Sequence, residues 1–508
     1  MSTDYIVAID QSTSATKACL FDREARIVGR VTIEHRQYYP QPGWVEHDAL
    51  EIIANTRAAL SDVLDTAGVA PDQVAAVAVT NQRETVVAWD SVTGIPVHRA
   101  LVWQDERGTE RCRELLAGGE AAAIQNKTGL VVDTYFSASK LQWLMDNSAE
   151  CKRAAAADTL MAGTMDTWVI WNLTGRTVFA TDHSNASRTL LYNIETCEWD
   201  EELRSIFHST NVQLPEVRFA DQSFGITTIG DSSVEIPIYG VMGDSHAALF
   251  GHAGFAVGDA KTTFGTGSSV MMNVGPRMLI PPTGIVSSIA WGVNETVSYV
   301  YEGNIHSTGD TVRWVRDQLG LFSSYADAEK RASALQDNGG VYVVPAFSGL
   351  GAPHWVHGIR ATISGLARSS TADHIIRAAL ESIAFQVHDV ISTMTTGGGV
   401  KLPALRVDGG PTANRFLMQF LADILAVPVH VGEIEEISAR GVAFAAGLAT
   451  GFWSGSGSQP ELVALAALAS LVRPAATFTP AMSADRREAL LDGWQAAVTR
   501  TLTGASHS

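Results

Sequence analysis

The sequence predicts an α/β fold, because short apolar strands alternate with longer segments of helical periodicity. Residues 5–9 and 18–21 are apolar runs separated by a polar turn, which is typical of a strand hairpin. The longest expected helix begins near Ala372, since apolar residues then recur every three or four positions until the glycines at 397–399 end it. A further helix is expected to begin after an N-cap at Ser137.

The two halves of the chain share one pattern, in which a strand, a turn rich in Ser, Thr and Gly, and a second strand follow each other. The pattern occurs around residues 5–21 and again around residues 261–273. The length of 508 residues is too great for one hydrophobic core and indicates two to four domains. The repeated pattern favours two, residues 1–252 and 253–508. A flexible loop or linker is expected at residues 451–460, which are rich in Ser and Gly.

The composition argues against several classes of protein. The 54 acidic and 36 basic side chains give a net charge of −18, so sequence-independent binding of nucleic acid is not expected. Cys19, Cys112, Cys151 and Cys197 lie far apart without a Cys-x-x-Cys pair, which favours reduced thiols over disulfides or a zinc site. No N-terminal signal and no apolar run of about 18 residues is found, so we expect a soluble, cytoplasmic protein without membrane insertion.

Asp244 is the strongest candidate for a catalytic residue. It stands within the stretch from Val241 to Phe250, between an apolar, strand-like run and a helix-like run. A carboxylate in such a position can take a proton from a substrate hydroxyl. The alternative is that Asp244 only caps the helix that follows it.

Three turns have the composition of phosphate-binding loops. Small residues at 12–15 and 265–268 let backbone N–H groups approach anionic oxygens. In the first turn, Lys17 adds positive charge and Asp10, at the end of a buried strand, can reach Mg²⁺ directly or through water. The third turn, residues 408–414, joins a strand to a helix and could face a nucleoside. Each segment also fits an ordinary turn, and no P-loop or dinucleotide-binding motif is present.

Arg83 and Glu84 form a donor beside an acceptor, a combination that suits vicinal hydroxyl groups. They stand where an expected strand pair, residues 74–80 and 86–89, is interrupted by polar residues. Neighbouring residues of an intact strand face opposite sides, so both side chains reach one ligand only if the backbone turns there. An idle ion pair on a surface hairpin is the alternative.

Two long motifs resemble the signatures of the FGGY family of carbohydrate kinases. YFSASKLQWLMDN, at residues 135–147, fits the first signature, and the segment from ATISGL at 361–366 to AALE at 378–381 fits the second. The resemblance runs over essentially the whole chain. It is closest to the glycerol-phosphorylating members, on the motifs at residues 42–47, 80–85, 185–189 and 345–353.

The resemblance implies two ribonuclease H-like domains of the actin/Hsp70 ATPase type, with ATP and Mg²⁺ in the cleft between them. Asp244 would be the general base and Asp10 would assist Mg²⁺. Glycerol would be the leading substrate of a homodimer or homotetramer. The polyol-binding residues would be Arg83, Glu84, Trp103, Tyr135, Asp244, Ser245 and Ser269. The residues that line ATP would be Thr13, Ser14, Lys17, Thr266, Gly309, Arg313, Gly410 and Asn414.

Several positions depart from the family pattern. Ser245 replaces the usual Gln after the general base, and Ser269 replaces a Phe near the Gly-Thr-Gly turn. Both changes remove bulk, so a longer polyol or ketose such as erythritol, threitol, xylitol or xylulose is an alternative substrate. Residues 230–236 lack the Gly and Arg that bind fructose 1,6-bisphosphate in some relatives, so we expect no inhibition by it. A non-catalytic, actin-like ATP-binding protein is a more remote alternative, since fold does not fix function.

Overall fold

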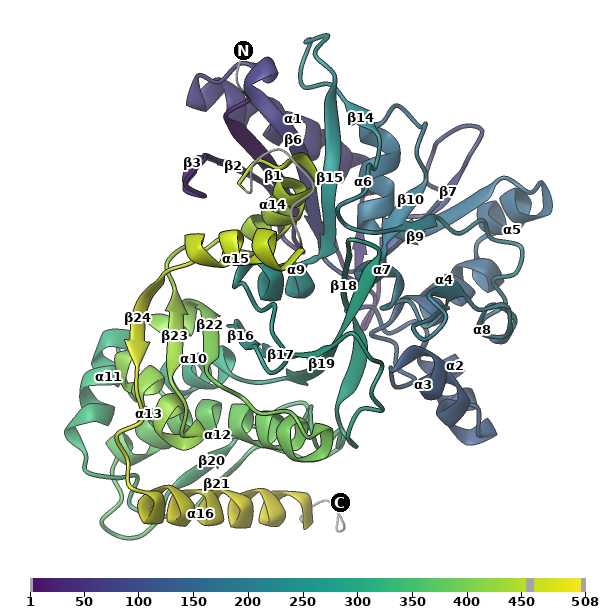
Figure 1. Ribbon diagram of the computed structural model, residues 1–508. Helices are drawn as coiled ribbons and strands as arrows, with labels where there is room; N and C mark the ends of the chain where they lie inside the picture. The colour runs from purple at the N-terminus through teal and green to yellow at the C-terminus, as the bar shows by residue number, and fades with distance from the viewer. Residues whose placement is uncertain (1–2, 454–460, 504–508) are drawn as a thin grey trace.

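The computed structural model describes residues 3–453 and 461–503 and confirms the α/β class. One mixed sheet of six strands belongs to the N-terminal half, in the spatial order β14-β15-β6-β1-β2-β3 (Figure 1). The hairpin expected near the N-terminus is present as β1 and β2. The strands are β1 Tyr5–Gln11, β2 Ala15–Phe21, β3 Ile27–Glu34, β6 Val74–Asn81, β14 Ile226–Thr227 and β15 Ile236–Gly243.

A second mixed sheet belongs to the C-terminal half and has the order β18-β19-β17-β16-β22-β23-β24. Its strands β16, β17, β19, β22, β23 and β24 have the same pairing order as β1, β2, β3, β6, β15 and β14 of the first sheet. The two halves therefore repeat one strand order, as the shared sequence pattern suggested, although the edge strand β14 precedes β15 in the chain and β24 follows β23. The strands are β16 Ala260–Phe264, β17 Ser268–Gly275, β18 Val286–Val293, β19 Thr296–Ile305, β22 Leu405–Gly409, β23 Val429–Gly432 and β24 Pro474–Phe478.

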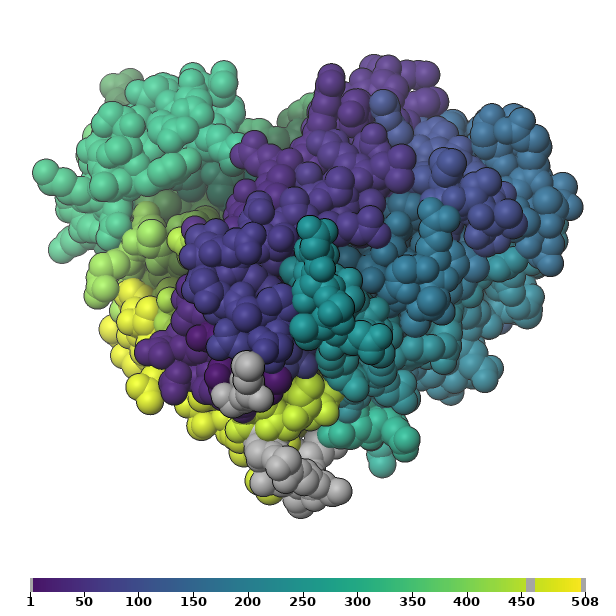
Figure 2. All heavy atoms as spheres, turned by 90° about the horizontal axis from the view of Figure 1, so that it is seen from above, coloured from purple at the N-terminus to yellow at the C-terminus, as the bar shows by residue number. Residues whose placement is uncertain are grey.

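Two helices lie between the sheets and join the lobes. α14, Ile437–Thr450, comes from the C-terminal half but packs on β1, β6 and β15 of the first sheet. α9, Asp244–Gly251, packs on α14 and on β16 and β17 of the second sheet. Apolar residues of both sheets and both helices share one buried cluster, so the lobes meet through a continuous core. In Figure 2 the purple N-terminal and green C-terminal residues adjoin along a hollow.

The outer faces of the sheets are covered by longer helices. α1, Ala49–Ala67, and α6, Met165–Leu173, cover the N-terminal sheet. α12 spans Ala372–Gly398 with its C-cap at Gly399, as the sequence predicted, and packs on the second sheet beside α13, Arg415–Leu425. The other helices of the C-terminal half are α10 Gly309–Asp317, α11 Tyr325–Ala334, α15 Glu461–Leu471 and α16 Ala484–Thr503.

A smaller unit is inserted into the N-terminal lobe around a five-stranded sheet of order β4-β5-β8-β7-β9. Its strands are β4 Gln37–Tyr38, β5 Glu46–His47, β7 Val86–Asp90, β8 Ala100–Leu101 and β9 Leu160–Thr164. Four helices lie between β8 and β9, namely α2 Thr109–Gly118, α3 Ala121–Thr128, α4 Ser137–Asn147 and α5 Ala149–Ala156, and α7 His183–Ala186 and α8 Glu201–Ile206 follow β9. Two-stranded pairs are β10 Ala180–Asp182 with β13 Glu216–Arg218, β11 Tyr192–Asn193 with β12 Glu198–Trp199, and β20 Tyr342–Val344 with β21 Thr362–Ser364.

Two local expectations were wrong. β6 and β7 are not a strand pair, because β6 lies between β1 and β15 whereas β7 pairs with β8 and β9. A left-handed residue between them, Glu84 at φ 61°, redirects the chain into the second sheet. Ser137 is not an N-cap, because Phe136 holds that position and the Ser137 hydroxyl donates to the carbonyl of Glu84 at 3.0 Å instead.

Two further expectations concern the linker and the membrane. The expected linker at residues 451–460 falls largely outside the described residues. Within residues 3–453 and 461–503, no helix combines the length and apolar character needed to cross a bilayer.

Candidate active site

Three parallel strands bring the candidate catalytic residues to one edge of the N-terminal sheet. β6 pairs in parallel with β1 on one side and β15 on the other, so their carboxyl ends lie together. Asp10 lies near the end of β1, Arg83 follows β6, and Asp244 follows β15 as the first residue of α9. Asp244 keeps 39% of its side chain exposed, so its carboxylate is accessible to a ligand.

Arg83 links this edge to the opposite lobe. Its Nε atom lies 3.2 Å from Oδ1 of Asp244. Its two terminal nitrogens donate to the carboxylate of Glu302 in β19, at 3.0 and 2.8 Å. Such a two-pronged contact fixes the plane of the guanidinium group. Arg83 is thus held between a carboxylate of each lobe.

Glu84 and Arg188 complete a buried ion network. The Nε atom of Arg188 donates to Oε1 of Glu84 at 2.6 Å, and its Nη1 atom lies 2.7 Å from Oε2 of Glu302. Burial alone would raise the pKa of Glu302, but the neighbouring Arg188 and Arg83 lower it well below its ordinary value. Two arginines and two glutamates therefore balance their charges away from water.

Glu302 and Arg188 were missed as site residues by the sequence analysis. Arg188 belongs to a motif used there only for the resemblance. Glu302 had a sequence signal of its own, because it is a lone acid among apolar residues in the segment that forms β19. The structure shows that its side chain is fully buried. Buried carboxylates are rare unless they are paired.

Two aromatic rings stand beside the ion network. The rings of Trp103 and Tyr135 lie 5.4 Å apart, and the indole N–H of Trp103 donates to the hydroxyl of Thr13 at 3.0 Å. The loop that carries Tyr135 is held by the buried Lys140, whose ammonium group donates to the carbonyls of Thr134, Tyr135 and Phe136 at 2.6, 2.9 and 2.8 Å. The rings can form an apolar wall for a carbon chain.

Ser245 and Ser269 are half-buried and close to the same groups. The backbone N–H of Ser245 donates to Oδ1 of Asp244 at 2.6 Å. The hydroxyl of Ser269 lies 3.5 Å from Oε1 of Glu302. Two short polar side chains therefore stand next to the residues that surround Arg83.

The turn between β1 and β2 carries Thr13 and Ser14, and Lys17 follows it in β2. The Lys17 ammonium group makes a 2.8 Å ion pair with Glu436, just before α14. This pairing was not anticipated, because the two residues lie 419 positions apart. Burial raises the pKa of Asp10 to about 7, although Lys17 opposes the shift. A nearby cation would therefore favour the carboxylate form of Asp10.

A separate cavity of about 560 Å³ lies in the C-terminal lobe, a size within the usual range for small-molecule sites. Val312, Leu380, Ile383 and Leu417 give it apolar walls. Five of the residues expected to line ATP border it, namely Thr266, Gly309, Arg313, Gly410 and Asn414. Tyr325 and Glu329 also line the cavity and were not anticipated. The cavity can hold a flat ring system between apolar side chains.

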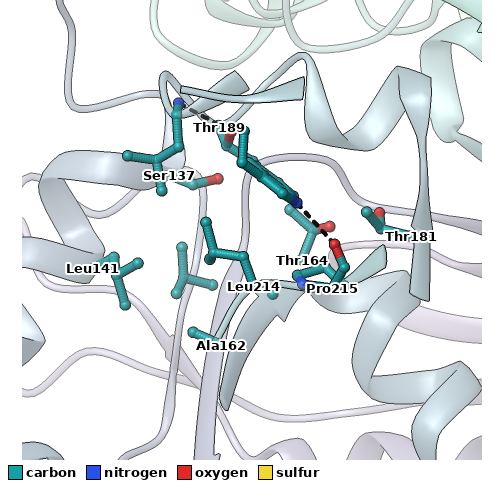
Figure 3. Close-up of a pocket in the computed structure, with 12 residues that line it drawn as sticks. Ser137, Leu141, Ala162, Thr164, Thr181, Thr189, Leu214 and Pro215 are labelled. Atoms are coloured by element: carbon teal, nitrogen blue, oxygen red, sulfur yellow. Dashed lines mark hydrogen bonds between the residues drawn. The ribbon is translucent and has the colours of Figure 1, made fainter. Parts of the chain in front are cut away.

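A much smaller cavity lies within the N-terminal lobe (Figure 3). Its volume is about 20 Å³ and its lining is mostly apolar, which is room for about one water molecule. Ser137 and Thr189 border it, and the N–H of Leu191 donates to the Thr189 hydroxyl at 3.1 Å (Figure 3). It is too small for a polyol, so the edge around Asp244 is the better candidate.

The chain is similar to known proteins over nearly its whole length. Models of the FGGY family of carbohydrate kinases match residues 5–251 with the N-terminal domain and residues 260–450 with the C-terminal domain. Glycerol kinase 1 of Thermotoga maritima is 49% identical over 98% of this chain and 100% of its own length. The glycerol kinase of Symbiobacterium thermophilum is 48% identical over 98% of this chain and 99% of its own length.

Solved structures show the same fold. The crystal structure of Plasmodium falciparum glycerol kinase with ADP superimposes with a TM-score of 0.91, at 35% identity and 99% coverage of both chains. The xylulose kinase of Lactobacillus acidophilus reaches a TM-score of 0.84 at 20% identity, again over 99% of both chains. The expected actin/Hsp70-type pair of ribonuclease H-like domains is therefore confirmed.

Proposed function

The chain belongs to the FGGY family of carbohydrate kinases, and from this premise we propose that it transfers the γ-phosphoryl group of ATP to a primary hydroxyl of glycerol. The products are glycerol 3-phosphate and ADP. The observation that carries the proposal is the contact between Arg83 and Asp244, because it places an orienting donor beside an exposed carboxylate. The relatives that are glycerol kinases over nearly their full length support glycerol as the substrate.

Asp244 acts as the general base. Its accessible carboxylate accepts the proton of the attacking hydroxyl as the oxygen bonds to phosphorus. Arg83 donates to one hydroxyl of the polyol and Glu84 accepts from another. Trp103 and Tyr135 cover the carbon chain. These contacts orient one primary hydroxyl for an in-line attack.

The nucleotide occupies the C-terminal cavity, with its phosphates directed toward the two turns of small residues. Thr266, Gly309, Arg313, Gly410 and Asn414 contact it from the C-terminal lobe, and Thr13, Ser14 and Lys17 reach the phosphates from the N-terminal lobe. When bound, Mg²⁺ neutralises phosphate charge, and Asp10 would hold it directly or through water. Closure of the lobes excludes water, which would otherwise take the phosphoryl group.

A longer polyol or ketose is a second candidate substrate. The observation that favours it is the pair of short side chains at Ser245 and Ser269, which have less bulk than the usual Gln and Phe of the family pattern and add hydroxyl groups near Asp244 and Glu302. Erythritol and threitol extend glycerol by one carbon and are the first examples to compare.

We assign residues 1–252 to the polyol-binding domain with the general base and residues 253–508 to the ATP-binding domain. The boundary follows α9, which ends at Gly251. By the resemblance to the family, we also propose a cytoplasmic homodimer or homotetramer.

The test is a coupled assay of ADP release with glycerol, erythritol, threitol, xylitol, ribulose and xylulose. We expect the highest kcat/KM with glycerol. A higher kcat/KM with a four-carbon polyol than with glycerol would make that polyol the preferred substrate. Absence of ADP release with every compound would contradict the proposed function.

A further inference from the structure

Glu302 joins the two lobes at the polyol site, although it belongs to none of the motifs discussed above. It lies in β19 of the second sheet, is fully buried, and contacts both arginines of the ion network. We propose that Glu302 is a positioning residue that holds Arg83 from the opposite lobe and thereby sets the affinity for the polyol. The inference rests on the proposed function.

Two hydrogen bonds to Glu302 fix the position of the Arg83 guanidinium group. Both oxygens of Glu302 accept from Arg83, Oε2 from Nη1 at 3.0 Å and Oε1 from Nη2 at 2.8 Å. This arrangement leaves Nε as the nitrogen of Arg83 that faces Asp244, at 3.2 Å. A guanidinium group bound at two points cannot rotate about its long axis without breaking both contacts. The orientation of Arg83 toward the reacting edge therefore depends on Glu302.

Glu302 also balances the charges of the two buried arginines. Arg188 contacts Oε2 of Glu302 at 2.7 Å and Glu84 at 2.6 Å. If Glu302 lost its charge, Glu84 would be the one buried carboxylate among the described residues left to both guanidinium groups, and only Arg83 would also contact the partly exposed Asp244. Two like charges in such a place repel each other strongly. Arg83, whose Nε already faces the accessible Asp244, is the arginine that can turn outward.

The residues around the proposed polyol site come from both lobes. Arg83 follows β6 of the first sheet, whereas Glu302 is 219 positions later in the second sheet. Ser269, a proposed polyol contact, comes from the neighbouring strand β17 and lies 3.5 Å from the same carboxylate. The polyol site is therefore complete only when the two sheets hold their present spacing. Through Glu302, the C-terminal lobe holds Arg83 in the position that the polyol site needs.

The experiment compares Glu302→Gln with Glu381→Gln. Glu381 is a matched control, because it is also fully buried, accepts from an arginine (Arg377) at 2.7 Å and from an amide (Asn338) at 3.0 Å, and lies in α12. For Glu302→Gln we expect the KM for glycerol and its Kd without nucleotide to rise on the order of 30-fold. The KM for ATP should stay within about twofold, since Glu302 does not line the nucleotide cavity. Glu381→Gln should lower the melting temperature but keep the KM for glycerol.

Glu302→Asp tests the same point with the charge retained. Its shorter side chain keeps the balance with the arginines but moves the carboxylate, so we expect a rise of the KM for glycerol of about fivefold, between the wild type and Glu302→Gln. This variant decides the question if Glu302→Gln does not fold.

The outcomes separate this inference from the proposed function. If the wild-type protein phosphorylates glycerol and the variants at Glu302 keep its KM, the inference is wrong and the proposed function stands. The inference is also wrong if the KM values for glycerol and ATP rise by the same factor. If the wild-type protein phosphorylates none of the polyols, the proposed function fails and this inference fails with it.

Discussion

Nε of Arg83 and Oδ1 of Asp244 are 3.2 Å apart. The side chain that orients the substrate in our proposal therefore touches the one that takes its proton. This contact has a consequence for mutational tests, because a change at either residue disturbs the other. Substitutions that keep the shape of the side chain are the most informative.

Asp244→Asn keeps the shape and can still accept the hydrogen bond from the N–H of Ser245. The amide cannot take the proton of the substrate, so we expect kcat to fall on the order of 1,000-fold. Binding of ADP, measured by calorimetry, should be unchanged, because Asp244 does not line the nucleotide cavity. Turnover close to that of the wild type would remove Asp244 from the mechanism.

The double variant Ser245→Gln, Ser269→Phe tests the spare room in the polyol site. The larger side chains should lower kcat/KM for erythritol and threitol relative to glycerol by about tenfold, since they fill the space that a fourth carbon needs. Ser268→Ala is a suitable control, because its hydroxyl faces Thr308 at 2.8 Å on the other side of the strand. An unchanged ratio in the double variant would mean that these serines do not limit the length of the substrate.

Gly410→Val tests the nucleotide cavity. Gly410 lines the cavity, and a Cβ atom there would meet no atom of the protein within 4 Å. The variant should therefore fold, and its valine side chain should occupy space that the nucleotide needs. We expect the KM for ATP to rise about tenfold. The Kd for glycerol, measured without nucleotide, serves as the control. Equal changes in both constants would indicate a general disturbance of the fold.

Fructose 1,6-bisphosphate should leave the rate unchanged at millimolar concentration. The segment that binds it in some relatives borders a hollow of about 380 Å³, lined by Asp65 and Asp231 together with Ser61 and Gly230. Two acidic side chains repel a bisphosphate. Rates measured over a concentration series would check this, and a concentration-dependent inhibition of the wild-type protein would contradict it.

Local patterns in the sequence predicted the elements that form from local contacts. The β1–β2 hairpin and α12 were identified in this way, because a hairpin depends on its turn and a helix on its apolar period. The expected pairing of β6 with β7 was wrong because the pairing of β6 depends on contacts between distant parts of the chain. Its partners β1 and β15 are distant in the chain, and the polar residues before β7 indicated a break but not the direction that the left-handed residue Glu84 gives to the chain.

The candidate site shows the same division. Arg83, in the motif at residues 80–85, and Asp244, between a strand-like and a helix-like run, could be proposed as site residues before the structure. The ion network could not, because it brings together side chains at positions 83, 84, 188 and 302 and no pattern of spacing links them. The pairing of Lys17 with Glu436 has the same cause, since it depends on how α14 crosses to the N-terminal sheet.

The protonation state of Lys140 should make the KM for glycerol depend on pH. Burial lowers the pKa of Lys140 from 10.5 to about 8, although Glu84 and other nearby acids oppose the shift. Above pH 8 the neutral amine has two N–H donors for the three carbonyls that it now holds. The loop with Tyr135 should loosen, and we expect the KM for glycerol to rise about tenfold between pH 7 and 9.5.

Deprotonation of Lys140 should weaken glycerol binding but raise the free energy of unfolding, so the KM for glycerol and the stability respond to pH in opposite ways. Between pH 8 and 10.5 the unfolded chain binds more protons at this lysine than the folded chain, so this group makes the folded state more stable as the pH rises. A rise in KM therefore cannot be attributed to unfolding at Lys140. Lys140→Met should have a high KM at pH 7 and no further rise, because methionine has no donor to lose. A KM for glycerol that stays constant from pH 7 to 9.5 in the wild type would show that the ammonium group does not position Tyr135.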